Sequence, residues 1–349
     1  MAMKSLIVVW NKSNAKSFED QIPLLFNGMR NLRLGSKNAF DVLFLEGLNL
    51  LSRGYKERLS GLGYKLHDLA TCYRKFESKY SKLAQFGDYE RKCFLRWLVI
   101  KDFCGNSPFV HYDADVVFNA TPEELDSAFA GLTFVLQGCP AYTRVSDPTW
   151  LEIYETELDS FNRNIKAYSE NAWNQRDSYI TRFKELNSNI WDRRLLSSDQ
   201  DLLQFLTLSG RLAQADAAVI SARNNYALFQ NPITIRRDLQ LSRPFKYERR
   251  DGIDYINSVK VAFWHMQGDF SDYLGYATFR NQLGNHHRVP WIRARQNSPS
   301  SVDYSVYRTL RRLVPLYSRN RLLHRYFGGE ADLNILLNSR TFWEDGTFA

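Results

Sequence analysis

Short apolar runs alternate with longer amphipathic segments over the first third of the chain. Apolar residues cluster in short runs at 5–10, 41–46, 64–69 and 109–112, which predicts four strands. Apolar residues recur at helical spacing over 16–33 and 88–103, which predicts two helices. Strands that alternate with helices are typical of βαβ units and a mostly parallel sheet. Such a sheet binds its ligands at the carboxyl ends of its strands.

Two capping patterns predict where later helices begin. Thr121 can cap a helix that has Pro122 at its first position and Glu124 three residues after the cap. Ser198, followed by Asp201 and an apolar run, has the same form. The remaining predicted elements are strands at 134–136 and 259–264 and a helical stretch over 150–195. We therefore expect an α/β fold with a mixed, mostly parallel central sheet flanked by helices.

Composition excludes several classes of protein. The chain has 349 residues and 44% hydrophobic residues, which excludes global disorder. Its four cysteines stand far apart and predict neither a zinc ribbon nor a disulfide framework. No apolar run reaches the length of a membrane-spanning helix, and the apolar run that ends at Trp10 is too short for a signal peptide. We expect a cytoplasmic protein, either free or peripheral on the cytoplasmic face of a membrane.

The net charge of +8 is concentrated near the C-terminus. The segment Arg288–Arg325 holds nine arginines, no lysine and a single acid, Asp303. Val306, Leu310 and Leu313 recur there at helical spacing, with arginines off that stripe. Such a helix can lie on an anionic membrane surface, or it can pack its apolar stripe on the protein and leave its arginines in water. A local basic block favours a local anionic partner, and we expect no binding to nucleic acid.

Two acids directly follow the predicted strand 109–112. Asp113 and Asp115 stand at i and i+2, so their carboxylates would project to the same side of an extended chain. At the end of a buried strand they would repel each other strongly unless a cation lies between them. Oxygen ligands of this kind suit Mg²⁺ or Mn²⁺.

Two further pieces could complete a metal site. Asp199, Gln200 and Asp201 stand at a predicted helix start, where acids also serve simply as caps. His265 ends a predicted strand, where a histidine can equally be structural. Together with the acid pair, these pieces predict a divalent metal site of two carboxylates and one imidazole, with an acidic helix terminus nearby.

With these motifs in this order, the sequence resembles the GT-A glycosyltransferases. It is most similar to the group that contains glycogenin and the bacterial lipopolysaccharide galactosyl- and glucosyltransferases. The resemblance covers roughly residues 5–270 and implies a Rossmann-like GT-A fold. It implies a catalytic domain over 1–285, with a nucleotide-binding half (1–118) and an acceptor half (119–285). The change in composition near 286 predicts that a basic helical segment (286–349) follows this domain.

The resemblance also implies roles for individual residues. Asp113, Asp115 and His265 would bind Mn²⁺ (or Mg²⁺), which holds the diphosphate of a nucleotide sugar. Asp199 and Gln200 would lie at the donor sugar. The other residues assigned to the donor site are Trp10, Asn11, Arg96 (with Lys92 as its substitute), Asp113 itself and Gly268.

The implied activity is transfer of a hexose from a nucleotide sugar, with UDP favoured, to a glycan or lipid-linked glycan, as in lipopolysaccharide biosynthesis. Breaking the anomeric bond places negative charge on a diphosphate, which a metal and an arginine can stabilise. Asp199 or Asp201 suits the general base of an inverting route, whereas Gln200 suits a retaining route. The sequence leaves both routes open.

Two other functions fit parts of the sequence. In a haloacid-dehalogenase-like phosphatase, Asp113 would be the nucleophile and Asp115 a general acid, although that motif normally stands on the first strand. A non-enzymatic protein that binds anions or nucleic acid would use the arginine block. That function does not explain the three motifs that predict a metal site.

Overall fold

A computed structural model describes residues 3–12, 24–37, 39–136, 140–185, 191–213, 226–227, 247–251, 253–256 and 258–265. The chain divides into two compact units, Met1–Asn224 and Asn225–Ala349. Residues 16–23 of the first predicted helix, Gly268 and the basic segment 286–349 lie outside the described residues.

A six-stranded sheet forms the centre of the first unit, in the order β3-β2-β1-β4-β7-β6. The pairs β1–β2, β2–β3 and β1–β4 are parallel, and β4–β7 and β6–β7 are antiparallel. The strands are β1 (Lys4–Trp10), β2 (Phe40–Glu46), β3 (Lys65–Asp68), β4 (Phe109–Tyr112), β6 (Phe134–Val135) and β7 (Tyr142–Val145). The predicted α/β class with a mixed, mostly parallel sheet is therefore confirmed.

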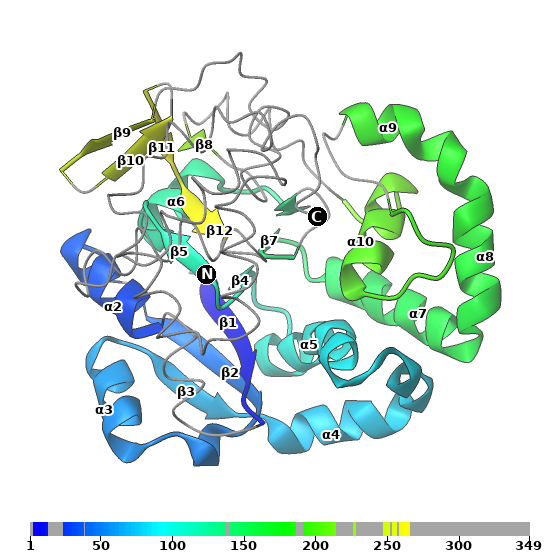
Figure 1. Ribbon diagram of the computed structural model, residues 1–349, viewed down its shortest axis with the longest axis horizontal. Coiled ribbons are helices and arrows are strands. Elements are labelled where there is room, and N and C mark those ends of the chain that lie inside the picture. The colour runs from blue at the N-terminus through cyan, green and yellow to red at the C-terminus, as the bar shows by residue number, and fades with distance from the viewer. Residues whose placement is uncertain are drawn as a thin grey trace, which may run out of the picture. The chain divides into compact units, whose positions relative to one another are not determined.

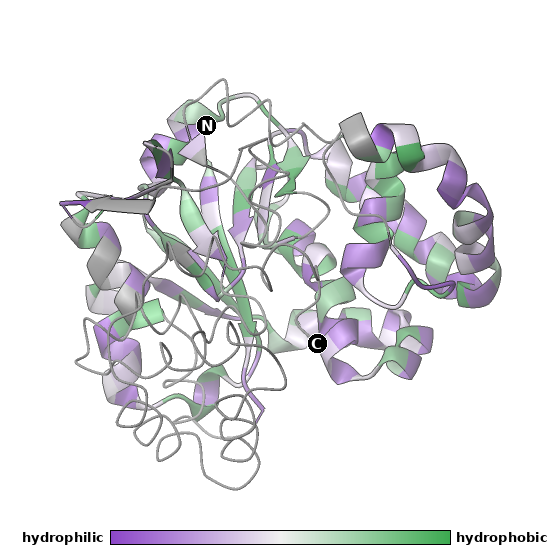
Figure 2. Cartoon of the chain, turned by 45° about the horizontal axis from the view of Figure 1, so that its top comes forward, coloured by the Kyte–Doolittle hydropathy of each residue, from purple (hydrophilic) through white to green (hydrophobic). Residues whose placement is uncertain are grey.

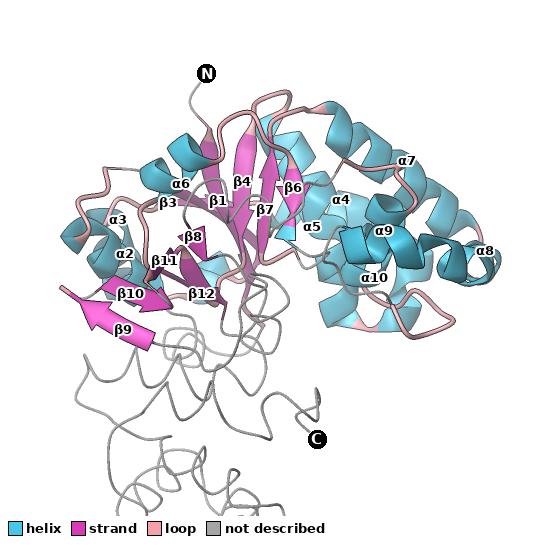
Figure 3. Cartoon of the chain, turned by 90° about the horizontal axis from the view of Figure 1, so that it is seen from above, coloured by secondary structure: helices cyan, strands magenta, loops and turns pink. Residues whose placement is uncertain are grey.

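The strand order reverses its direction at β1. Strands β2 and β3 lie in sequence order on one side of β1. The next strand of this sheet, β4, pairs with the opposite side of β1. Because crossovers between parallel strands are right-handed, the connecting helices must change faces at this point. Figures 1 and 3 show α2 (Leu24–Arg33), α3 (Arg53–Gly61) and α6 (Pro122–Ala128) on one face, and α4 (Ala70–Lys79) and α5 (Asp88–Cys104) on the other. Ligands of open α/β sheets bind at such a reversal.

Further helices extend the α5 side of the sheet. They are α7 (Thr149–Arg163), α8 (Ile165–Gln175), α9 (Ile180–Glu185) and α10 (Asp199–Leu208). Short 3₁₀ turns connect some of these elements: η1 (Leu48–Leu50), η2 (Ser81–Phe86) and η4 (Arg176–Tyr179). The strands are largely apolar, whereas the helices carry both apolar and polar faces (Figure 2). Every residue of α5 from Lys92 to Ile100 is buried. This part of the helix therefore lies within the core of the protein.

Both predicted helix starts are confirmed. Thr121 and Glu124 form a complete capping box at α6. The Ser198 hydroxyl accepts the Asp201 backbone N–H at the start of α10. The predicted helix at 88–103 is α5, and α7 to α9 lie within the predicted helical stretch 150–195.

The second unit contains a four-stranded sheet in the order β8-β11-β10-β9. Its strands are β8 (Tyr226–Ala227), β9 (Tyr247–Arg250), β10 (Ile253–Ile256) and β11 (Val259–Val261). The predicted strand 259–264 is interrupted at Ala262 and continues as β12 (Phe263–His265). The Trp264 indole donates a 2.8 Å hydrogen bond to Asp254, and both residues are buried.

The described residues bear on the expectations about membrane spans and disulfides. Among these residues, no helix is both long enough and apolar enough to cross a bilayer. Cys72, Cys93 and Cys104 are free, and burial raises the pKa of the Cys72 thiol to about 11.

The turn after β2 requires glycine. Gly47 has a φ of 81°, and a Cβ atom there would lie 2.0 Å from the backbone oxygen of Asn11. Gly35 has a φ of 83° but nothing within 4 Å of the corresponding position. We expect Gly47→Ala to lower the free energy of unfolding by about 1–3 kcal/mol more than Gly35→Ala, measured by urea unfolding. If the two variants lose the same free energy of unfolding, the Asn11 backbone does not crowd position 47.

Candidate functional site

Three parallel strands end at the same edge of the first sheet. β1, β2 and β4 end at Trp10, Glu46 and Tyr112, on either side of the reversal in strand order. The backbone N–H of Asn11 donates to the Glu46 carbonyl at 3.1 Å, which joins the ends of β1 and β2. The acid pair that follows β4 therefore lies at the edge where this sheet type binds ligands.

Asp113 and Asp115 lie in a turn, not in the extended chain that the sequence predicted. The Val116 N–H donates to the Asp113 carbonyl at 3.1 Å and closes this turn. Asn27 of α2 fixes the following strand, β5 (Val116–Phe118), because its amide donates to the Val116 carbonyl at 2.6 Å and accepts from the Phe118 N–H at 3.3 Å. The turn is thus held from both ends.

Asp113, Asp115 and His265 form a cluster that could hold a metal ion. Each offers one ligand atom, and all three atoms lie within 4.8 Å of one another. Divalent ions hold their ligands at about 2.0–2.6 Å, so two ligands of one ion can be about 4–5 Å apart. The three groups therefore fit a divalent cation, and the two carboxylates are ligands that Mn²⁺ and Mg²⁺ sites use.

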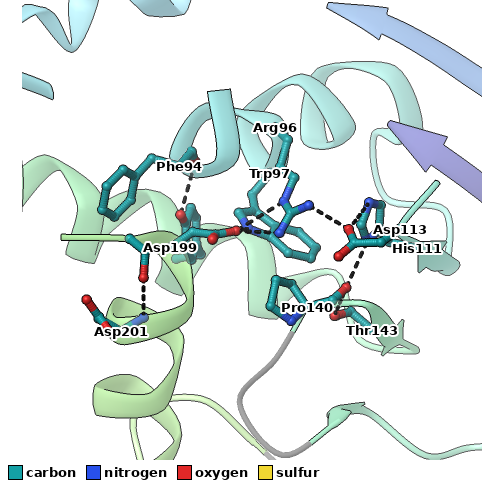
Figure 4. A network of polar contacts seen from close by, with 11 residues as sticks. Phe94, Arg96, Trp97, His111, Asp113, Pro140, Thr143, Asp199 and Asp201 are labelled. Carbon is teal, nitrogen blue, oxygen red and sulfur yellow. Dashed lines mark hydrogen bonds and ion pairs between the residues drawn. The ribbon is translucent and has the colours of Figure 1, made fainter. Parts of the chain in front are cut away.

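Arg96 connects the two acidic motifs. Its Nη1 donates to Asp113 at 2.7 Å, and its Nε and Nη2 donate to the same oxygen of Asp199 at 3.0 and 2.7 Å (Figure 4). Burial disfavours the charge on Arg96, but the carboxylates of Asp199 and Asp113 outweigh it and raise the pKa of the guanidinium. Arg96 is therefore a fixed positive charge between β4 and α10.

Trp97 also contributes a hydrogen bond to this network. Its indole N–H donates to Asp199 Oδ2 at 3.1 Å, so that one oxygen accepts three hydrogen bonds. Trp97 is fully buried, and its ring meets His111 and Trp150 edge to face at 5.2 and 5.4 Å. The position of Asp199 is thus fixed by the hydrophobic core.

The charged residues of α5 recur every four positions. Asp88, Lys92 and Arg96 share one face of the helix because residues four apart lie one above the other. Lys92 is 0% exposed and pairs with Glu46 at 3.0 Å and Asp88 at 2.5 Å, so it does not take the place of Arg96 at Asp113. Burial disfavours the Asp88 carboxylate, but hydrogen bonds from Lys12 and Lys92 outweigh it and lower its pKa to about 2.

His111 is a neighbour of the site that the sequence analysis did not identify. It is fully buried on β4, its Nδ1 lies 3.1 Å from the Pro140 carbonyl, and its Nε2 lies 3.8 Å from Asp113. Burial, followed by the charge of Arg96, lowers its pKa to about 4. Because a carbonyl only accepts, Nδ1 carries the proton and Nε2 turns a lone pair toward Asp113. Its signal in the sequence was a polar residue two positions before Asp113, on the same face of an apolar strand.

The start of α10 carries the other predicted catalytic residues. Asp201 is partly buried and accepts hydrogen bonds from the Ser197 N–H and hydroxyl at 2.8 and 3.2 Å. Burial raises its pKa, and the hydrogen bonds from Ser197 and Ser198 act against that shift. Gln200 lies between Asp199 and Asp201 on the first turn and is partly exposed. Asp201 and Ser198 therefore take part in capping α10, and the catalytic roles of Asp199, Gln200 and Asp201 stay predictions.

The end of β1 presents an aromatic pair and a buried amide. Trp10 meets Tyr89 edge to face at 5.4 Å, and Tyr89 is 63% exposed. Asn11 is buried, and its Nδ2 has no hydrogen-bond partner among the residues that the structure describes. Such a group is ready to donate to a ligand, and the assignment of Trp10 and Asn11 to the donor site stays a prediction.

The structure thus brings together most of the residues that the sequence selected: Asp113, Asp115 and His265 in one cluster, and Arg96, Asp113 and Asp199 in one network. Comparison of the chain with protein-family models and with curated proteins finds no match.

Proposed function

We propose that the protein is a metal-dependent glycosyltransferase. It would move a hexose from a nucleotide sugar, with a UDP-sugar favoured, to a glycan or a lipid-linked glycan. The observation that carries this proposal is the cluster of Asp113, Asp115 and His265, whose ligand atoms lie within 4.8 Å of one another. The acid pair of that cluster follows β4 next to the reversal in strand order, where α/β sheets bind nucleotides.

The residues around the cluster suit the departure of a diphosphate. A divalent cation bound there supplies positive charge that stabilises a diphosphate leaving group. Arg96 holds the Asp113 carboxylate in a fixed orientation through its 2.7 Å hydrogen bond. At the neighbouring strand end, Trp10 offers an aromatic ring on which a base can stack. Asn11 offers an amide N–H that has no partner among the described residues and can donate to the nucleoside.

The acceptor hydroxyl must lose a proton during transfer. In an inverting route Asp201 is the candidate proton acceptor, because burial raises its pKa. The inward oxygen of Asp199 already accepts three hydrogen bonds. In a retaining route Gln200, on the same helical turn, would face the sugar.

A thermal shift assay with UDP and Mn²⁺, together and apart, tests the proposal. We expect UDP to raise the melting temperature only when Mn²⁺ is present, because the ion joins the carboxylates to the diphosphate. Stabilisation by beryllium fluoride with Mg²⁺ would instead indicate a phosphatase, and stabilisation by an oligonucleotide alone a binding protein. A screen of UDP- and GDP-sugars, scored by hydrolysis, would then identify the donor.

A further inference from the structure

The positive charge of Arg96 lies beside the candidate cation site. Arg96 donates to Asp113, which is one of the three potential metal ligands. A guanidinium this close to a cation site repels the cation and competes with it for the carboxylate. A metal site that contains such an arginine therefore needs a compensating negative charge.

Asp199 supplies that charge in direct contact with Arg96. Two of the three nitrogens of Arg96 donate to its Oδ2, at 3.0 and 2.7 Å, and both residues are buried. The pair is therefore neutral overall, while its remaining nitrogen, Nη1, still points at Asp113 (Figure 4). The guanidinium can orient the carboxylate without adding net positive charge to the site.

The geometry of Asp199 is set by groups away from the metal ligands. Its Oδ2 also accepts the Trp97 indole N–H at 3.1 Å, and Trp97 is locked in the core. The residue stands in the first turn of α10, where the helix dipole favours a carboxylate. Two hydrogen bonds from Arg96 and one from Trp97 thus hold Asp199 in place.

The other groups around Arg96 do not provide the missing charge. His111 is buried beside Asp113 with its Nδ1 3.1 Å from the Pro140 carbonyl, and its imidazole ring supplies no negative charge. Cys93, on the same helix, is buried, and burial raises the pKa of its thiol. Glu90, also on this helix, interacts with Arg96 electrostatically. Among the described residues outside the cluster, Asp199 is the carboxylate that contacts Arg96 directly.

We propose that Asp199 is a positioning residue that neutralises Arg96 and aims its Nη1 at Asp113, so that the Asp113–Asp115–His265 cluster can bind a divalent cation tightly. This inference rests on the metal site of the proposed function and is independent of sugar transfer. It assigns to Asp199 a role in binding of the ion alone, before any nucleotide is present.

The test is a double-mutant cycle on the full-length protein, with the dissociation constant for Mn²⁺ measured by electron paramagnetic resonance without nucleotide. We expect Asp199→Asn to weaken Mn²⁺ binding by about 10- to 100-fold, because Arg96 then carries an unbalanced charge. The double variant Arg96→Gln/Asp199→Asn restores neutrality and should bind Mn²⁺ about tenfold more tightly than Asp199→Asn alone. Circular dichroism confirms that each variant is folded.

A matched control separates charge balance from general damage. Asp126 forms a second arginine–aspartate pair in the first unit, with Arg144 Nη1 at 2.6 Å and Arg144 buried. Asp126→Asn leaves a buried arginine without its partner, yet we expect Mn²⁺ affinity within about twofold of the unmodified protein. An equal loss in Asp126→Asn would overturn the inference.

Two other results would also overturn it. If Asp199→Asn binds Mn²⁺ as tightly as the unmodified protein does, Asp199 does not contribute to metal binding. A double variant that binds no better than Asp199→Asn would mean that unbalanced charge is not the cause. If the unmodified protein binds Mn²⁺ and passes this cycle but hydrolyses no nucleotide sugar, the proposed function fails and the inference stands.

Discussion

Replacing Asp115 by asparagine should reduce hydrolysis and transfer of the donor sugar by about 1000-fold while the protein remains folded. Asp115 is one of three residues that offer ligand atoms to the candidate metal site. An amide has nearly the same shape as a carboxylate but no charge, so the substitution removes one of the two negative charges that attract the cation. The same variant should bind Mn²⁺ at least about 100-fold more weakly and lose stabilisation by UDP with Mn²⁺.

Asp177→Asn is the matched control, because it removes the same charge from a side chain that is 90% exposed on η4. It should retain the full rate and the full Mn²⁺ affinity. Both variants are compared by donor hydrolysis, by electron paramagnetic resonance with Mn²⁺ and by thermal melting without ligand. Near-normal turnover in Asp115→Asn would remove the basis for a metal-dependent reaction.

Trp97→Phe should destabilise the protein more than the same substitution at Trp150. Both tryptophans are buried and pack against each other at 5.4 Å, so the loss of ring volume is similar. The Trp97 indole N–H donates to the Asp199 carboxylate, whereas the Trp150 indole N–H has no partner within the described part of the chain. A hydrogen bond to a charged group is worth about 1.5–3 kcal/mol, so we expect the free energy of unfolding of Trp97→Phe to be lower by that amount than that of Trp150→Phe.

Urea unfolding followed by circular dichroism measures this difference without relying on tryptophan fluorescence. Trp97→Phe should also bind Mn²⁺ more weakly than Trp150→Phe, because Asp199 loses one of the three hydrogen bonds that hold it in place. Equal stability of the two variants would indicate that Asp199 does not need the indole.

The fold class followed from local signals in the sequence. The buried strand before Asp113 and the capping patterns at Thr121 and Ser198 depend on neighbouring residues, and all are confirmed. The cluster of Asp113, Asp115 and His265 was predicted from motif order, and its compactness agrees with that expectation.

Other elements were missed because their sequence signals are weak. β7 has Thr143 and Arg144 in its centre, and both are buried because Arg144 pairs with Asp126 and Thr143 donates to the Pro140 carbonyl. An apolar pattern cannot identify such a strand. α3 buries only Tyr55 and Leu59, which is too narrow a stripe to stand out.

The contact between Arg96 and Asp199 could not be predicted from the sequence either. The two residues are 103 positions apart, and either acid in the Asp199–Asp201 motif could have faced Arg96. The choice depends on the angle between α5 and α10, which tertiary packing sets. The turn at 113–116 likewise depends on Asn27, which comes from a distant helix.

The central position of β1 has a consequence for synthesis of the chain. β1 pairs with β2 on one side and with β4 on the other. During translation its apolar residues therefore leave the ribosome long before Phe109–Tyr112, the strand that covers their second edge. Until then β1 exposes an unpaired edge that other chains can join. The nascent chain should depend on chaperones most strongly in the interval between these two strands.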